Sequence, residues 1–276
     1  MKYTLLTVRT LAIATMILAI SSCDKNNNLS LFSAADDAQL GAQVAAQIAD
    51  DPTNYPLLPE TGNEEAYEYL QAIVDDIMAT GEVQYKTEFA WEVYIIDQDV
   101  LNAFCTPGGY IYVYTGLIKY LDNVDDLAGV MGHEMAHADL RHSSRQLQTQ
   151  YGVGTLLSLL LGDNPNQLAE IAAGLANGIS SLQFSQKHEK ESDARSVEYL
   201  AGTDYACNGA ASFFEKLLED GQGSTSGLEA FLSTHPSSES RVEDINEKAD
   251  DLNCDKTLSN DNTNGMSYQA FQALFD

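Results

Sequence analysis

The stretch Gly132-His133-Glu134-Met135-Ala136-His137 decides how this chain is organised, because it places the H-E-x-x-H pattern inside an apolar run that begins at Leu127. Residues four apart on a helix lie on one face, so His133 and His137 can offer two imidazole nitrogens to one zinc ion. Glu134 then lies beside the ion, where it can take a proton from zinc-bound water. The alternative is a surface helix with two solvated histidines, and a third ligand elsewhere in the chain decides between the two interpretations.

The composition indicates a globular protein with a strongly acidic surface. Of the 276 residues, 44% are hydrophobic, which suits one large core or two smaller ones. The 41 acidic and 14 basic residues give a formal charge of -27. Such a chain repels phosphate backbones, so we expect no nucleic acid partner. No repeat of about 20 to 50 residues is present, so we also expect no repeat domain for partner binding.

Residues 1–22 have the pattern of a lipoprotein signal peptide. Lys2 and Arg9 precede an apolar segment, Leu11–Ile20, that is too short for a spanning helix and is followed by Ser21-Ser22-Cys23. This ending resembles the bacterial lipobox, in which the cysteine is acylated and becomes the first mature residue. Residues 23–33 would then be the acylated Cys23 and a polar tether. The alternative is an ordinary signal peptide with a chance cysteine.

Apolar periodicity predicts a series of helices, and β-branched and aromatic residues predict strands. A strand is expected over 88–97. A turn at 106–109 joins 102–105 to 110–115 as a β-hairpin, with Ile111 and Val113 turned to the core. The tyrosines at 110, 112 and 114 then face the other way, either as a half-exposed surface or as a substrate-facing edge. The expected helices cover 34–50, 63 to 81, 123 to beyond 141, 153–161, 168–179, 185–200, 209–220 and a last segment ending near 252.

The two apolar stretches at 153–161 and 168–179 flank a polar turn. Each is well under the roughly 20 residues that a spanning helix needs. We therefore interpret them as a buried helical pair that walls the active site, with a membrane hairpin as the alternative.

The helix over 185–200 offers candidates for the third ligand. Glu189 and Asp193 are four residues apart on one face, whereas Glu191 points elsewhere, as a solvated charge would. Zinc takes carboxylate ligands, and its ligands need outer hydrogen-bond partners, so this pair offers both functions. The helix that carries His133 and His137 is called the metal helix. If it continues past residue 141, His142 faces away from these two ligands, and we interpret it as an outer or structural residue.

Several motifs occur in an order that is typical of one family. They are Asn102–Gly109, Thr115–Ile118, His133–His137 with Arg141-His142, Glu189-x-x-x-Asp193, and Leu232–Pro236 with Arg241. Over about residues 36 to 250 the chain resembles the gluzincin metallopeptidases related to the CAAX prenyl protease, most closely the exported bacterial branch of BepA-like and LoiP-like lipoproteins. Cys105, Gln186 and Ser192 depart from the usual pattern, and these departures leave the substrate open.

The resemblance implies an α+β, mostly helical, zincin-like metallopeptidase domain over residues 34–256, with a tail at 257–276. It implies a small β-sheet whose edge hairpin flanks the active site. It implies one Zn2+ held by His133, His137 and Glu189, with Asp193 and His142 around these ligands. Glu134 would be the catalytic base, and His235 and Arg241 would lie near the substrate.

The expected function is that of a zinc-dependent endopeptidase for misfolded or unassembled envelope proteins, bound as an added strand beside the 102–115 hairpin. Its expected location is the bacterial envelope, through a lipid anchor facing the periplasm, with the outer membrane favoured. The rivals are a chaperone-like lipoprotein with a silent or regulated metal site, and a zinc hydrolase of non-peptide substrates.

His235 and Arg241 are expected to stabilise the negative charge of a tetrahedral intermediate. In the alternative, His235 caps a helix and Arg241 pairs with a glutamate. His235 could also occupy the open position on zinc in the resting enzyme, in which case its removal raises activity.

Among the remaining cysteines, we expect Cys207 to pair with Cys254. Cys207 precedes one helix and Cys254 follows another, so an antiparallel arrangement of the two helices brings them together. Cys105 would then stay reduced beside the hairpin.

Overall fold

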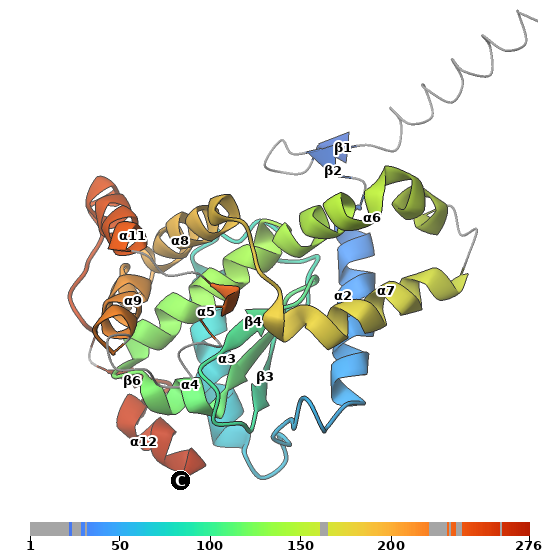
Figure 1. Cartoon of the computed structure of the whole chain (residues 1–276). Helices are drawn as coiled ribbons and strands as arrows, with labels where there is room; N and C mark the ends of the chain where they lie inside the picture. Colours follow the sequence, from blue (N-terminus) through green and yellow to red (C-terminus); the bar gives the residue numbers. More distant parts are fainter. Residues whose placement is uncertain are drawn as a thin grey trace, which may run out of the picture.

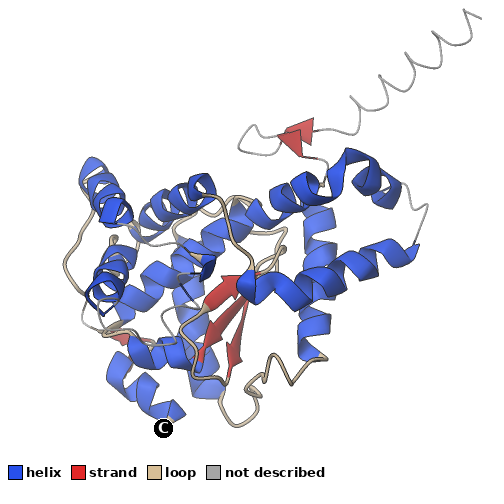
Figure 2. Ribbon diagram, viewed as in Figure 1, coloured by secondary structure: helices blue, strands red, loops and turns tan. Residues whose placement is uncertain are grey.

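The computed structural model describes residues 22–23, 29–30, 32–160, 165–220, 231, 233–235, 239–259 and 261–276. Within these ranges, helices surround one three-stranded sheet (Figures 1 and 2). The expected signal peptide up to residue 21, most of the tether, and Pro236 lie outside the described residues. The helices are α2 (Ala34–Ala49), α3 (Glu64–Ala79), α4 (Thr115–Tyr120), α5 (Val124–Asp139), α6 (His142–Leu160), α7 (Pro165–Gly178), η1 (Ile179–Ser181), α8 (Gln186–Leu200), α9 (Gly209–Asp220), α11 (Glu239–Leu252), α12 (Tyr268–Gln272) and η3 (Ala273–Phe275). The strands are β1 (Ser22–Cys23), β2 (Leu29–Ser30), β3 (Glu92–Ile96), β4 (Ala103–Cys105), β5 (Tyr110–Tyr114), β6 (Asn262–Thr263) and β7 (Met266–Ser267).

The three-stranded sheet has the order β3-β5-β4 and confirms the predicted hairpin. β4 is antiparallel to β5, whereas β3 is parallel to it. β5 is therefore the central strand, and β4 lies at an edge. The strand expected over 88–97 begins only at Glu92, because Trp91 has a φ of 52°, which an extended strand does not allow.

The two faces of β5 contribute to two different cores. Ile111 and Val113 face the larger core, with apolar residues of α3, α5 and α9. Tyr112 and Tyr114 are buried on the opposite face against residues of α2 and α7. The expectation of a half-exposed or substrate-facing tyrosine surface was therefore wrong for Tyr112 and Tyr114, whereas Tyr110 is half-buried. The sequence of a single strand does not reveal that a distant helix covers its second face.

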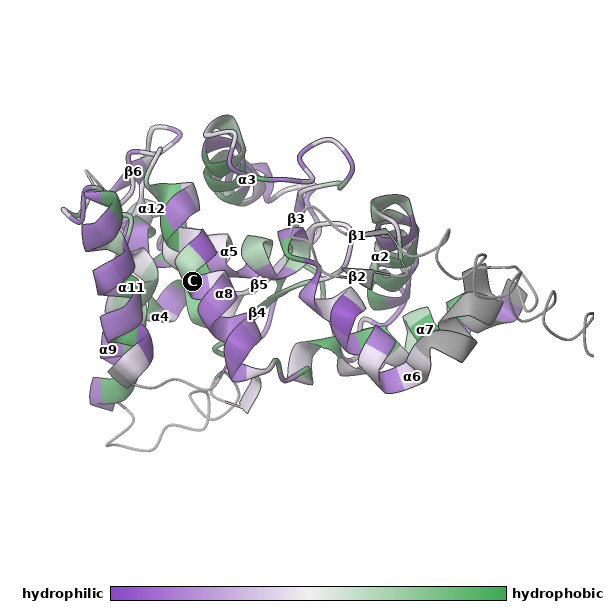
Figure 3. Cartoon of the chain, turned by 90° about the horizontal axis from the view of Figure 1, so that it is seen from above, coloured by the Kyte–Doolittle hydropathy of each residue, from purple (hydrophilic) through white to green (hydrophobic). Residues whose placement is uncertain are grey.

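The metal helix α5 is buried along its whole length. Asn123 caps it, because its side chain accepts a hydrogen bond from the Asp126 amide. β4 lies on one side of α5, and α8 and α9 pack on the others (Figure 1). Gly129 allows the backbone at Gly209 and Ala210 to approach, since an added Cβ would lie 2.1 Å from the Ala210 nitrogen. Figure 3 shows hydrophilic residues along α8 and α11, two helices of the surface.

α5 ends at Asp139 and does not continue past Arg141, contrary to the prediction. Arg141 has a φ of 60°, and its Nε donates a hydrogen bond to Asp37 of α2 over 2.5 Å. A buried arginine requires a partner, and the turn at Arg141 places its guanidinium beside Asp37. α6 starts anew at His142, so the helical rotation expected between His137 and His142 does not apply.

The expected helical pair is present as α6 and α7, but α7 packs mainly on α2. The side chains of 153–165 lie outside the described residues. Among the described residues, Ile179 at the end of the second predicted stretch lines the cavity beside β4, together with Leu182 and Phe184 of the α7–α8 connection. Among the described residues, no helix has both the length and the apolar character needed to cross a membrane.

The predicted disulfide joins Cys207 to Cys254, and Cys105 is a free, buried cysteine, as expected. The segment after residue 257 is packed onto the core. Phe271 stacks on Tyr69 with ring centroids 4.1 Å apart, and the Tyr268 hydroxyl donates to the Ile118 carbonyl. This contact joins α12 to α3 and α4.

Candidate metal centre

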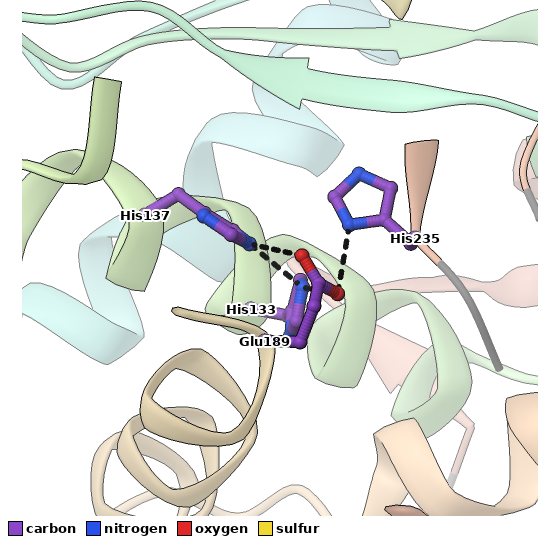
Figure 4. A group of neighbouring side chains, drawn as sticks. All are labelled: His133, His137, Glu189 and His235. Carbon is purple, nitrogen blue, oxygen red and sulfur yellow. Dashed lines mark hydrogen bonds and ion pairs between the residues drawn. The ribbon is translucent and has the colours of Figure 1, made fainter. Parts of the chain in front are cut away.

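The three predicted ligands meet a fourth side chain, His235, in one buried cluster (Figure 4). The Nε2 atoms of His133 and His137 lie 3.0 Å apart on successive turns of α5. Glu189 enters from α8, with its oxygens 3.5 Å and 3.4 Å from these two nitrogens. His235 closes the group, and the potential ligand atoms of all four residues lie within 4.8 Å of one another.

The second nitrogen of each metal-helix histidine faces a polar side chain of its own, at an ion-pair distance without hydrogen-bond alignment in the case of His133. His133 Nδ1 lies 2.9 Å from Asp193 Oδ1. His137 Nδ1 lies 3.0 Å from His142 Nδ1, so His142 faces the cluster and does not point away from it. A carboxylate can only accept a hydrogen bond, so the proton of neutral His133 belongs on Nδ1. This leaves a lone pair on Nε2, directed into the cluster.

These donors fit a metal ion. Glu134 Oε1 and Glu189 Oε1 are buried and accept no hydrogen bond from the described part of the chain. Buried carboxylate oxygens and an imidazole lone pair need a cation or a donor among them. Two histidines and one carboxylate, each oriented by an outer partner, are a set of ligands that zinc takes in catalytic sites.

The two glutamates have pKa values shifted in opposite directions, because their neighbours offset the effect of burial to different extents. Burial raises the pKa of Glu134, and nearby His235 and His133 only partly offset this effect. Burial would also raise the pKa of Glu189, but contacts with His133, His137 and His235 hold that pKa below its usual range. Glu189 therefore stays an anion suited to a cation, and Glu134 is a stronger base than a solvated glutamate.

His235 and Arg241, predicted to lie near the substrate, both contact the cluster. His235 Nδ1 lies 3.2 Å from Glu189 Oε2, and its Nε2 lies 3.5 Å from Glu134 Oε1. Arg241 donates two hydrogen bonds to Asp193, at 2.7 Å and 2.6 Å, and its Nη1 lies 3.0 Å from Glu189. Arg241 thus contacts both Glu189, the third candidate ligand, and Asp193, which lies beside His133.

A small cavity lies between the cluster and the edge strand. Its lining includes Glu134, His235 and residues 102–105, which contain β4. The opposite wall comes from Ile179, Leu182 and Phe184. The cavity thus brings Glu134 and β4 to the same small space.

Three contacts of the site were not anticipated from the sequence. Phe184 stacks on the His137 ring with centroids 4.0 Å apart. The guanidinium carbon of Arg241 lies 4.1 Å from the ring centroid of Phe214. Glu191, interpreted as a solvated charge, lies 3.1 Å from His142 Nε2. The first two belong to apolar patterns that predict only a core. The contact between Glu191 and His142 depends on the turn at Arg141, which the sequence does not reveal.

Comparison with known proteins agrees with this geometry. Residues 64–249 match the model of Peptidase family M48. The beta-barrel assembly-enhancing protease of Escherichia coli (strain K12) is 33% identical over 178 residues, which are 60% of this chain and 36% of that protein. The mitochondrial metalloendopeptidase OMA1 of Schizosaccharomyces pombe is 30% identical over 181 residues, which are 65% of this chain and 52% of that protein.

The chain therefore spans 36% to 52% of the length of these two relatives. The OMA1 protein of Arabidopsis thaliana is 33% identical over 152 residues. The family match covers the sheet, the metal helix and both segments that bring Glu189 and Arg241 to it. M48 metallopeptidases use zinc, in keeping with the ligand set of the buried cluster. The chain belongs to Peptidase family M48.

Proposed function

We propose that this protein is a zinc-dependent endopeptidase. The observation that carries the proposal is the convergence of His133, His137 and Glu189, with Glu134 lining a small cavity that the edge strand β4 also lines. A zinc ion held by these three residues would act as a Lewis acid and lower the pKa of water at its open position.

The roles of the protein residues follow from their positions. Glu134 takes a proton from the attacking water and returns it to the amine that leaves. Its burial favours the protonated form, so the carboxylate binds the proton readily after it has been taken from water. Phe184 and the apolar wall beside it limit water around these groups.

The proposed substrates are polypeptides in extended conformation. Within the described residues β4 pairs only with β5, and the proposed substrate strand would pair, main chain to main chain, with its other edge. This mode of binding accepts many sequences, as misfolded or unassembled envelope proteins would require. The names of the two relatives, a beta-barrel assembly-enhancing protease and a mitochondrial metalloendopeptidase, are compatible with such work.

Arg241 acts in this proposal by positioning Glu189 and Asp193, since its donors already contact both carboxylates. His235 faces the space between Glu189 and Glu134. His235→Ala tests its two roles: a loss of turnover on the order of a hundredfold assigns it to the transition state, and a gain assigns it to the open position on zinc.

The decisive experiment compares the wild-type protein with Glu134→Gln. Both are assayed for zinc by mass spectrometry and for cleavage of an unfolded protein such as casein. We expect one zinc per chain in both proteins and a loss of turnover of at least about a thousandfold in the variant. Zinc binding without Glu134-dependent cleavage would favour the chaperone-like alternative.

We also propose that Cys23 carries a lipid anchor that holds the protein at the bacterial envelope, facing the periplasm and at the outer membrane. The support is the lipobox pattern before this residue. Cys23→Ser should move the protein from the membrane fraction to the soluble fraction, whereas Cys105→Ser should not. Equal membrane retention of the Cys23→Ser protein would contradict the anchor.

A further inference from the structure

A path of polar contacts leads from one candidate ligand to the far side of α8. His137 Nδ1 lies 3.0 Å from His142 Nδ1, and His142 Nε2 lies 3.1 Å from Glu191 Oε2. Both histidines are buried, whereas the Glu191 side chain keeps 33% of its surface exposed. The path therefore begins at the metal centre and ends at solvent.

The proton positions along the path follow from the chemistry of its ends. If His137 offers Nε2 to the ion, its proton lies on Nδ1 and is donated to His142 Nδ1. His142 must then accept at Nδ1 and carry its own proton on Nε2. Glu191 is the group that accepts this proton's hydrogen bond, and as a carboxylate it can only accept. One end of the path thus fixes the tautomer at the other.

The surroundings of Glu191 hold it in that position. Arg145 Nη2 lies 3.3 Å from the same oxygen that faces His142, and Lys187 lies 3.5 Å from the other oxygen. Ser192, the neighbour of Glu191 on α8, places its hydroxyl 3.3 Å from His142 Nδ1. The surface pocket that contains Glu191 and Arg145 shares no lining residue with the substrate cavity.

We propose that His142 and Glu191 are positioning residues that fix the tautomer and ring orientation of His137, and thereby strengthen zinc binding, from the side of the fold remote from the substrate. This inference rests on the zinc site of the proposed function. It gives a role to a glutamate whose spacing from Glu189 excludes it from the ligand set. Outer partners of metal ligands typically change metal affinity by about 10- to 100-fold when they are removed.

The test measures the zinc dissociation constant of the full-length protein by competition with a chromogenic chelator. The variants are His142→Ala, Glu191→Ala and Glu191→Gln, with Glu198→Ala as the matched control. Glu198 lines the same pocket on the same helix, and its side chain is 29% exposed and paired with Arg195 and Lys248. It makes no contact with the path.

We expect zinc affinity to fall by about 10- to 100-fold in His142→Ala and about tenfold in Glu191→Ala. Glu191→Gln should remain within about threefold of wild type, because its amide oxygen still accepts from His142. Glu198→Ala should be unchanged. Replacing zinc by Co2+ gives a second readout, because the visible absorption of the ion should change in the first two variants and not in the control.

Equal zinc affinity and equal Co2+ spectra for Glu191→Ala and Glu198→Ala would overturn the proposal. If His142→Ala does not fold, Glu191→Ala still decides the question, because its side chain is partly exposed and its loss leaves no cavity. His133→Ala separates the two levels of inference. Retention of zinc by that variant would refute the metal site itself, whereas loss of zinc there with no effect at Glu191 would refute only the path.

Discussion

His133 and His137 lie on adjacent turns of one helix and face the same candidate ion, yet their outer partners differ in kind. His133 is backed by a buried charged pair, Asp193 with Arg241. His137 is backed by an imidazole, His142, whose own partner reaches solvent. Substitutions in the two halves of the centre should therefore have different effects. Removing one member of a buried charged pair leaves the other charge buried without its partner, which destabilises the fold. A path of hydrogen bonds that ends in water can replace a lost group with water.

The largest expected effect is on the His133 half. Asp193→Ala leaves Arg241 buried without its two strongest acceptors, and breaking such a pair costs about 3 to 5 kcal/mol of unfolding free energy. Zinc affinity should also fall, by on the order of a hundredfold, because His133 Nδ1 loses its carboxylate. Urea unfolding and chelator competition measure the two effects.

The control for this prediction removes both charges. Asp193→Leu with Arg241→Met should recover part of the stability lost in Asp193→Ala, because the arginine no longer lies buried without the aspartate and Glu189 keeps its contacts with the histidines. Zinc affinity should remain weak in the double variant, since His133 still lacks its acceptor. A single variant as stable as the wild type would show that the charged pair is not what holds this half together.

The two halves also differ in how far the sequence predicts them. H-E-x-x-H and the i, i+4 spacing of Glu189 and Asp193 place the His133 half, because both rest on the regular geometry of a helix. The His137 half depends on Arg141, which takes a left-handed conformation that its residue type does not signal. The buried face of Tyr112 has a similar origin, since α2 lies far away in sequence. Local periodicity predicts the elements, and long-range contacts decide which face is covered.

The disulfide offers a smaller perturbation on the His133 side, because it joins the segment after α8 to the end of α11, the helix that carries Arg241. Replacing Cys207 and Cys254 by alanine should lower the free energy of unfolding by about 2 to 4 kcal/mol, mainly by freeing the unfolded chain. Zinc affinity of the folded variant should stay within about threefold of wild type. A loss as large as that of Asp193→Ala would mean that the bridge itself holds Arg241 in place.

The smallest expected effect compares Asp193 with another buried aspartate that has no arginine beside it. Burial would raise the pKa of Asp193, but Arg241 and His133 hold it below its usual value. Asp126 lies in the first turn of the metal helix, where burial raises its pKa from 3.8 to about 6 despite a hydrogen bond from Ser212. A group whose pKa is higher in the folded protein binds protons preferentially there. Its contribution to stability is therefore present below pH 3.8 and is lost as the pH rises through 6.

Relative to Asp126→Asn, the unfolding free energy of the wild type should fall between pH 4 and pH 6, by at most about 1.4 kcal/mol per pH unit. Urea unfolding at several pH values measures this difference, and parallel pH profiles for the two proteins would show that Asp126 keeps an ordinary pKa.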